Sequence, residues 1–277
     1  MRRSVRAALL TGLIGSLFAG VVVAREGQTD PLARARQFYN QKQYDDAIRL
    51  AREARRVPAL ADAAAVIFAR AHLERYRANS EENDLAEARE ALFAVQDAKL
   101  SLRDHMELVV GLGELLYFDR RFSAAAEFFD VALAHLELLE AGARERLLDW
   151  WAGALDQQAQ SQPDVERKPI YVRILLRMED ELRREDRSAV ASYWLPAAAR
   201  GANDLDRAWG AALAGWVRAP LTGSAGAKLR ADLDRLVSGV IIPERARQLS
   251  LPADQRTAMA ALQQEWEDVK EKYGKQF

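Results

Sequence analysis

The stretch that decides the fold is residues 30–58, DPLARARQFYNQKQYDDAIRLAREARRVP. Small residues recur on both sides of a short polar turn, with Ala35 before it and Ala47, Ala51 and Ala54 after it. Residues spaced three or four apart share one face of an α-helix. Pro58 predicts the end of the second helix, because the residue before a proline disfavours helical geometry. The stretch therefore predicts two helices that pack closely along their alanine faces.

The composition of the whole chain favours helices. Among its 277 residues, glycine (15) and proline (8) are sparse, and Ala, Leu, Arg and Glu, which are strong helix formers, dominate. The 40 basic and 41 acidic residues nearly balance, so no global basic field attracts nucleic acid. The chain has no cysteine, which excludes disulfides, thiolate catalysis and cysteine-based metal sites.

The helix-turn-helix pattern recurs along the chain. A second good copy spans residues 105–138, with the pair Leu112-Gly113 in its first helix. Its second helix repeats large and small residues at the same steps, namely Phe122, Ala125, Phe129 and Ala132. Three weaker copies follow the same logic: 69–98 with a loop at 79–84, 143–184 with helices 143–160 and 170–184, and 188–220 with its second helix at 204–219. In these, Gly153 takes a small packing position and Pro196 predicts a kink.

This pattern resembles the tetratricopeptide repeat (TPR), a 34-residue helix-turn-helix unit. Two phrases carry the resemblance, Tyr44-Asp45-Asp46-Ala47 and Leu112-Gly113. It covers about residues 30–220, as two good and three degenerate repeats within a repeat region of 25–220. The resemblance implies an all-α, right-handed α-solenoid whose open end is capped by helices in 221–277. The alternative is an unrelated helical bundle whose alanines mark close packing.

The first 24 residues have the features of an export signal. Arginines at positions 2, 3 and 6 precede an apolar run over 7–24, and Val22 and Ala24 fit a small-residue cleavage site. The same run is long enough for an uncleaved membrane anchor. Both alternatives predict export, to the periplasm or the medium, or tethered to the inner membrane.

The last segment predicts a cap. A helix at 228–238 is expected to break at 239–243, and the final helix at 254–273 carries one apolar stripe. The stripe consists of Met259, Leu262, Trp266, Val269 and Tyr273. It suits a helix that covers the end of the repeats, and the alternative is a helix that binds a partner or a second copy.

A search for catalytic or metal-binding patterns finds none. The three histidines, at 72, 105 and 135, lie far apart, and His72 takes a packing position, so we expect it to be buried. Acid pairs such as Glu179-Asp180 lie beside arginines in the sequence, a pattern that indicates a solvated helix face. The sequence therefore predicts a protein that is not an enzyme, with no catalytic residue, metal or cofactor. An enzyme built from acids in the C-terminal half stays as an alternative.

The TPR resemblance implies a binding face on the first helix of each repeat, which grips another protein or a peptide. Carried over residue by residue, the groove candidates are Leu32, Arg36, Tyr39, Asn40, Val110, Glu114, Tyr117 and Phe118. The clamp that some relatives use for a C-terminal carboxylate is incomplete, because only Arg36 and Asn40 match it. The resemblance thus implies an interaction scaffold, the export signal predicts that it acts in the cell envelope, and the balanced charge argues against nucleic acid as a partner. A structural subunit of a membrane-associated complex, held through an uncleaved N-terminal segment, is the alternative.

Two adjacent aromatic pairs are further interface candidates: Trp150-Trp151 and Tyr193-Trp194. Neighbours on a helix point about 100° apart, so both members of a pair cannot face one core. One member of each pair is therefore expected at the surface, where aromatics anchor interfaces, or buried against a neighbouring helix.

Overall fold

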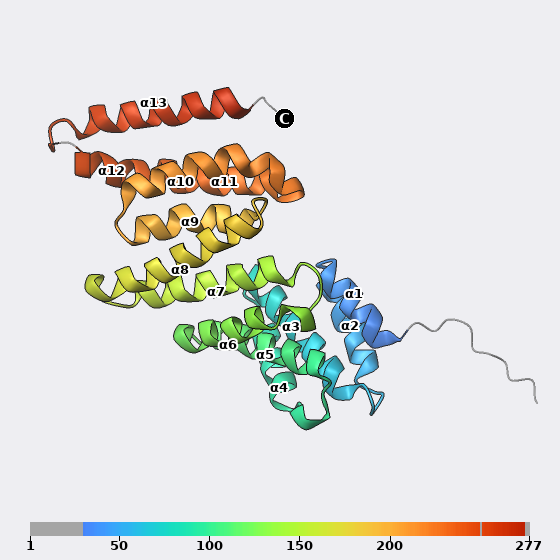
Figure 1. Cartoon of the computed structure of the whole chain (residues 1–277). Helices are drawn as coiled ribbons and strands as arrows, with labels where there is room; N and C mark the ends of the chain where they lie inside the picture. Colours follow the sequence, from blue (N-terminus) through green and yellow to red (C-terminus); the bar gives the residue numbers. More distant parts are fainter. Residues whose placement is uncertain (1–29, 250, 275–277) are drawn as a thin grey trace, which may run out of the picture.

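The computed structural model describes residues 30–249 and 251–274, and within these ranges the chain is helical and contains no strand (Figure 1). The α-helices are α1 (Pro31–Asn40), α2 (Tyr44–Ala54), α3 (Ala61–Asn79), α4 (Glu82–Phe93), α5 (Leu102–Phe118), α6 (Phe122–Ala134), α7 (Ala143–Gln160), α8 (Asp164–Arg184), α9 (Ala189–Gly201), α10 (Leu205–Arg218), α11 (Gly226–Leu236), α12 (Ile242–Leu249) and α13 (Gln255–Gly274). Short 3₁₀ turns lie at Asp97–Lys99, Leu136–Leu138 and Ala219–Ala225. No described helix is long and apolar enough to cross a membrane. The predicted export signal at 1–24 lies outside the described residues.

Helices that follow one another in sequence pack against one another in space. Each helix from α1 to α10 packs against the next, and the packing is loosest between α4 and α5. The first helix of one hairpin also contacts the first helix of the next, as in α1 with α3 and α7 with α9. In Figure 1, α7 to α13 lie as successive rows, and α1 to α6 lie beside their lower edge. The predicted all-α class and its consecutive helix packing are confirmed.

Three of the turns share one backbone geometry. Lys42, Arg120 and Asn203 each take the left-handed conformation, with φ near 60°, one residue before the last residue of the turn. In each, two N–H groups close the end of the preceding helix in the Schellman pattern. One hydrogen bond of each pair joins residues five positions apart in the sequence. These bonds run from Gln43 N to Phe38 O, Arg121 N to Leu116 O and Asp204 N to Ala199 O, each 2.9 Å long. The turns before α2, α6 and α10 are therefore structural equivalents.

The residues after each of these turns are equivalent too. The next helices begin at Tyr44, Phe122 and Leu205, and their fourth residues are fully buried alanines. These alanines are Ala47, Ala125 and Ala208. The spacing read from the sequence is thus confirmed at three places along the chain.

Glycines lie where two helices of a hairpin approach closely. A Cβ on Gly113 of α5 would lie 2.9 Å from Cε1 of Phe129 and 3.2 Å from Cβ of Phe128 in α6. A Cβ on Gly215 of α10 would lie 3.0 Å from the backbone oxygen of Ser192 in α9. A side chain at either position would force the helices apart, because these contacts are shorter than real Cβ atoms usually make.

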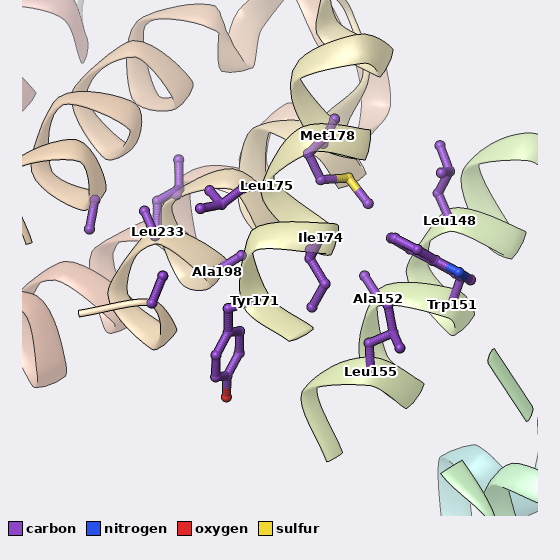
Figure 2. Close-up of a cluster of buried hydrophobic side chains, with 14 of the residues drawn as sticks. Leu148, Trp151, Ala152, Leu155, Tyr171, Ile174, Leu175, Met178, Ala198 and Leu233 are labelled. Carbon is purple, nitrogen blue, oxygen red and sulfur yellow. The ribbon is translucent and has the colours of Figure 1, made fainter. Parts of the chain in front are cut away.

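The core falls into two clusters that meet on α5. Leu108 and Leu115 of α5 pack with the helices before it, and Met106 and Val110 pack with the helices after it. Figure 2 shows part of the second cluster, where side chains of α7 and α8 face each other. Those labelled are Leu148, Trp151, Ala152 and Leu155 from α7, and Tyr171, Ile174, Leu175 and Met178 from α8. This buried seam continues to Ala198 of α9 and Leu233 of α11.

Some predicted helix ends are wrong. Residues 82–84, predicted as loop, form the first turn of α4, where Asp84 is buried and accepts hydrogen bonds from Arg75 of α3. Helix α8 begins at 164 instead of 170, and α9 continues through the buried Pro196. The predicted break at 239–243 is a π-helical turn (Val237–Ile241) that leads directly into α12, where Pro243 stands in the first turn. A proline is tolerated there because no helical N–H bond is required.

Helix α13 covers the end of the stack. Trp266 is fully buried against Trp209 and Trp216, with ring centroids 6.2 and 5.2 Å away. Its indole N–H donates to Asp234 of α11 at 2.8 Å. The predicted stripe packs at Leu262 and Trp266, is half-buried at Val269 and Tyr273, and is exposed at Met259.

Candidate binding surface on the first helices

Half of the eight groove candidates are buried. Leu32, Tyr39, Val110 and Glu114 are at most 3% exposed, Arg36, Tyr117 and Phe118 are half-buried, and Asn40 is exposed. The buried four cannot contact a partner, so the predicted groove is wrong at these positions. For Tyr39, Val110 and Glu114 the burial has a physical cause, because long side chains from α3 and α7 fill the space beside them.

Arg70 of α3 is the centre of this filling. It is buried, its Nη2 donates to the hydroxyl of Tyr39 at 2.9 Å, and its guanidinium lies 4.7 Å from the Tyr39 ring centroid. Glu114 lies 3.7 Å from it, an ion pair without a hydrogen bond. Arg146 of α7 covers the Tyr39 ring from 5.6 Å. The remaining space is a cavity of about 10 Å³, near the volume needed for one water molecule.

The Glu114 carboxyl is poorly satisfied in this environment. Its Oε2 is buried and has no hydrogen-bond partner, and the same holds for Nε of Arg70. Burial raises the pKa of Glu114 to about 7, and the nearby Arg70 only partly offsets this. Because no donor reaches the carboxylate, its charged form loses more hydration than Arg70 returns. This part of the face is a closed polar core and not a groove.

Farther along, aromatic side chains form an accessible strip. The first-helix strip comprises Tyr76 of α3, Tyr117 and Phe118 of α5, Trp150 of α7, and Tyr193 and Trp194 of α9. Neighbouring rings touch edge to face, with centroids 4.8 Å apart for Tyr76 and Phe118, 5.0 Å for Tyr117 and Trp150, and 5.4 Å for Tyr193 and Trp194. Apart from the buried Trp150, all are half-buried. The rings are therefore held by their neighbours, and all except Trp150 keep part of their surface exposed to solvent.

The adjacent tryptophans are both buried, on different sides of α7. Trp150 faces the strip and stacks on Phe129 with centroids 5.9 Å apart. Trp151 faces α8, where the guanidinium of Arg177 lies 4.8 Å from its ring. Of the two alternatives for this pair, burial against neighbouring helices is the outcome, so neither tryptophan serves as a surface anchor. In the second pair, Tyr193 and Trp194 both keep exposed area.

Gly153 leaves a gap in the strip. A Cβ at this position would lie 3.8 Å from Cζ2 of Trp194 and 4.0 Å from Cε2 of Tyr117, which is ordinary van der Waals contact. Gly153 itself is half-exposed. The expected role of Gly153 in close packing within its own hairpin is wrong, because the residue faces α5 and α9 instead. The two rings thus flank a stretch of bare backbone.

Polar contacts fix the ring beside this gap. Asp149 of α7 accepts a hydrogen bond from Nε1 of Trp194 at 3.0 Å and another from Arg77 of α3 at 2.7 Å. The Arg77 guanidinium lies 4.3 Å from the Trp150 ring. Three first helices are therefore joined through Asp149, which sets the orientation of Trp194. The members of this link lie more than 40 residues apart, so no local sequence pattern predicts it.

The predicted burial of His72 is confirmed. Its Nδ1 lies 2.6 Å from Asp84 Oδ1, and its ring contacts Phe68 with centroids 4.4 Å apart. Burial lowers the pKa of His72, although Asp84 opposes this shift. The histidine joins α3 to α4 and does not face the strip.

The chain matches no protein family, no curated protein and no solved structure. Among the residues that the structure describes, no group of three or more His, Asp or Glu is arranged to hold a metal ion. The assignment of a function therefore rests on the geometry of the surface itself.

Proposed function

We propose that the chain is an α-solenoid of TPR-like repeats that acts as a non-catalytic interaction scaffold of the bacterial cell envelope. It binds a peptide or a segment of a partner protein on the first-helix strip. The three equivalent turns at Lys42, Arg120 and Asn203 support the repeat interpretation. The observation that carries the binding function is the gap at Gly153 between two half-exposed rings.

The gap suits a side chain of the partner. An apolar or planar group that enters over Gly153 contacts the rings of Tyr117 and Trp194 together. Trp194 is already oriented by its hydrogen bond to Asp149, and Tyr117 by its contact with Trp150. Since both rings are held before binding, little side-chain entropy is lost when the partner arrives. Rigid aromatic anchors of this kind carry much of the binding energy at interfaces.

The acids of the C-terminal half support a non-catalytic role. Glu181, Glu179 and Glu244 each pair with an arginine of another element: Arg144, Arg207 and Arg200, respectively. Acids neutralised in separate ion pairs do not converge on one reacting group, as an acid–base site requires. Localisation in the envelope is proposed from the signal-like residues 1–24 alone.

Gly153→Leu tests the proposal. A Cβ fits at this position with ordinary contacts to Trp194 and Tyr117, and we expect the larger leucine side chain to fill the gap between the two rings. We expect the wild-type protein, immobilised as bait, to retain a discrete partner from an envelope extract of the source bacterium, and the variant to lose it.

The matched control is Gly210→Leu, on the exposed side of α10, where a Cβ would meet nothing within 4 Å. It should retain the partner. If the Gly153 variant keeps its helical CD spectrum and retains the same proteins as the wild type, the strip is not the binding surface.

A further inference from the structure

A second concave site lies away from the first-helix strip. It is a cleft of about 730 Å³ between the start of α8, the α9–α10 turn and α12. Its lining includes Lys168, Tyr171, Arg200, Glu244, Arg247 and Gln248. A second hollow of about 420 Å³ shares Lys168, Asn203 and Gln248 with it and extends along α8 to Val172 and Leu175. The two hollows form one elongated cleft.

The first hollow carries a surplus of positive charge. Its lining holds four cations against the two acids Asp164 and Glu244. Arg167 pairs with Asp164 and Arg200 with Glu244, so these charges cancel. Lys168 and Arg247 are exposed, and neither has an ion-pair partner among the described residues. The N-terminus of α8 adds partial positive charge at the same end.

The walls of this hollow are fixed. The Tyr171 ring lies against the backbone of Gly201, where a Cβ would approach it to 2.5 Å. Its hydroxyl donates to Asp156 at 2.9 Å, behind the wall. Burial raises the pKa of Asp156. On the other side, Gln248 donates to the side chain of Asn203 at 3.0 Å.

The second hollow has a different character. Val172, Leu175 and Leu205 give it an apolar floor. Of its charged groups, Arg207 pairs with Glu179 and Asp206 with Arg245, Lys168 is shared with the first hollow, and Asp204 accepts a hydrogen bond from the backbone N–H of Arg207 at 3.0 Å. The eleven-residue step from Asp164 to Leu175 spans roughly 16 Å of helix at 1.5 Å per residue. An extended chain covers that length with about five residues.

We propose that this cleft binds an acidic, extended segment of a partner protein, with its carboxylates at Lys168 and Arg247 and following apolar residues over Val172 and Leu175. Charge complementarity selects the acidic end, and the apolar floor selects the residues after it. A small anion would fill only the first hollow. The site is separate from the first-helix strip, so it does not depend on the scaffold proposal.

The test uses the purified chain and a fluorescein-labelled hexapeptide of four glutamates and then two leucines. Binding is measured by fluorescence anisotropy. We expect saturable binding that weakens with added salt. The double variant Lys168→Glu with Arg247→Glu should lower the affinity at least roughly tenfold, because two exposed attractions become repulsions. Gly153→Leu should leave this binding unchanged, which separates this test from that of the strip.

The matched control reverses the charge of one exposed lysine and one exposed arginine outside the cleft, with Lys99→Glu and Arg56→Glu. It should bind the peptide as the wild type does. Four outcomes would overturn the proposal. They are no saturation up to about 1 mM peptide, an equal loss in the control variant, equal binding of a peptide with lysines in place of the glutamates, and equal binding when serines replace the two leucines. Displacement of the peptide by inorganic phosphate at a lower concentration than by unlabelled peptide would assign the first hollow to a small anion, and would also overturn it.

Discussion

Glu114→Gln should make the protein more stable in mildly alkaline solution. Burial raises the pKa of this carboxyl from its ordinary 4.5 to about 7, so the folded state holds a proton that the unfolded state has already released. Stability therefore falls as the pH rises between these two values. At 1.36 kcal/mol per pH unit, the full loss is about 3 kcal/mol, and most of it occurs between about pH 5 and pH 8.

The glutamine variant has no proton to lose at this position. At about pH 5, where Glu114 is largely neutral, the two proteins should unfold at similar urea concentrations. At about pH 8 the variant should be more stable by roughly 2–3 kcal/mol. The measurement is urea unfolding followed by far-UV CD for both proteins at both pH values. All other titrating groups are shared, so their effects cancel in the difference.

A matched variant tests the reasoning on the same helix. Glu107 is also buried, but it faces Arg36 at 3.4 Å and Arg103 at 3.3 Å. Glu107→Gln should therefore lose stability at about pH 8, opposite in sign to Glu114→Gln, because it leaves Arg103 without its ion-pair partner and Arg36 with Asp104 alone. The reasoning is refuted if Glu114→Gln is the less stable protein at about pH 8, since that result would show that its pair with Arg70 outweighs the desolvation of the carboxylate.

Three further variants test the packing. Gly113→Ala should cost about 1–3 kcal/mol in urea unfolding, because its Cβ would lie 2.9 Å from the buried Phe129 ring. Gly210→Ala, with open space around it in α10, should instead stabilise by up to about 1 kcal/mol, and equal effects of the two would contradict the close approach of α5 and α6. Trp266→Ala should cost about 3–5 kcal/mol by removing a fully buried ring and its bond to Asp234. Limited proteolysis should then cut within α13 first, and unchanged protection of α13 would show that its docking does not depend on this ring.

The repeat spacing was readable from the sequence because its cause is local. Small residues three or four positions apart mark the face where the two helices of one hairpin meet, as at Ala47 and Ala125, which are fully buried. A turn of three residues then places the next helix alongside. None of this requires knowledge of distant parts of the chain.

The binding face could not be predicted in the same way. Whether Tyr39 or Glu114 is exposed depends on Arg70 and Arg146, which come from other hairpins and cover them. The small size of Gly153 predicts a residue at the contact within its own hairpin. That prediction is wrong because the sequence does not show which helix a glycine faces. Exposure of a first-helix position is thus set by side chains that arrive from neighbouring repeats.

The central claim is that a partner touches the strip around Gly153. A photo-crosslinking phenylalanine analogue placed at Tyr193, which is half-buried and whose ring lies 5.4 Å from that of Trp194, tests it directly in cells of the source organism and leaves both rings at the gap in place. Irradiation should produce one discrete adduct with another protein, and Gly153→Leu in the same chain should abolish it. The same probe at the exposed Gly210 should give no such adduct. No adduct from position 193, or the same adducts from both positions, would contradict the claim.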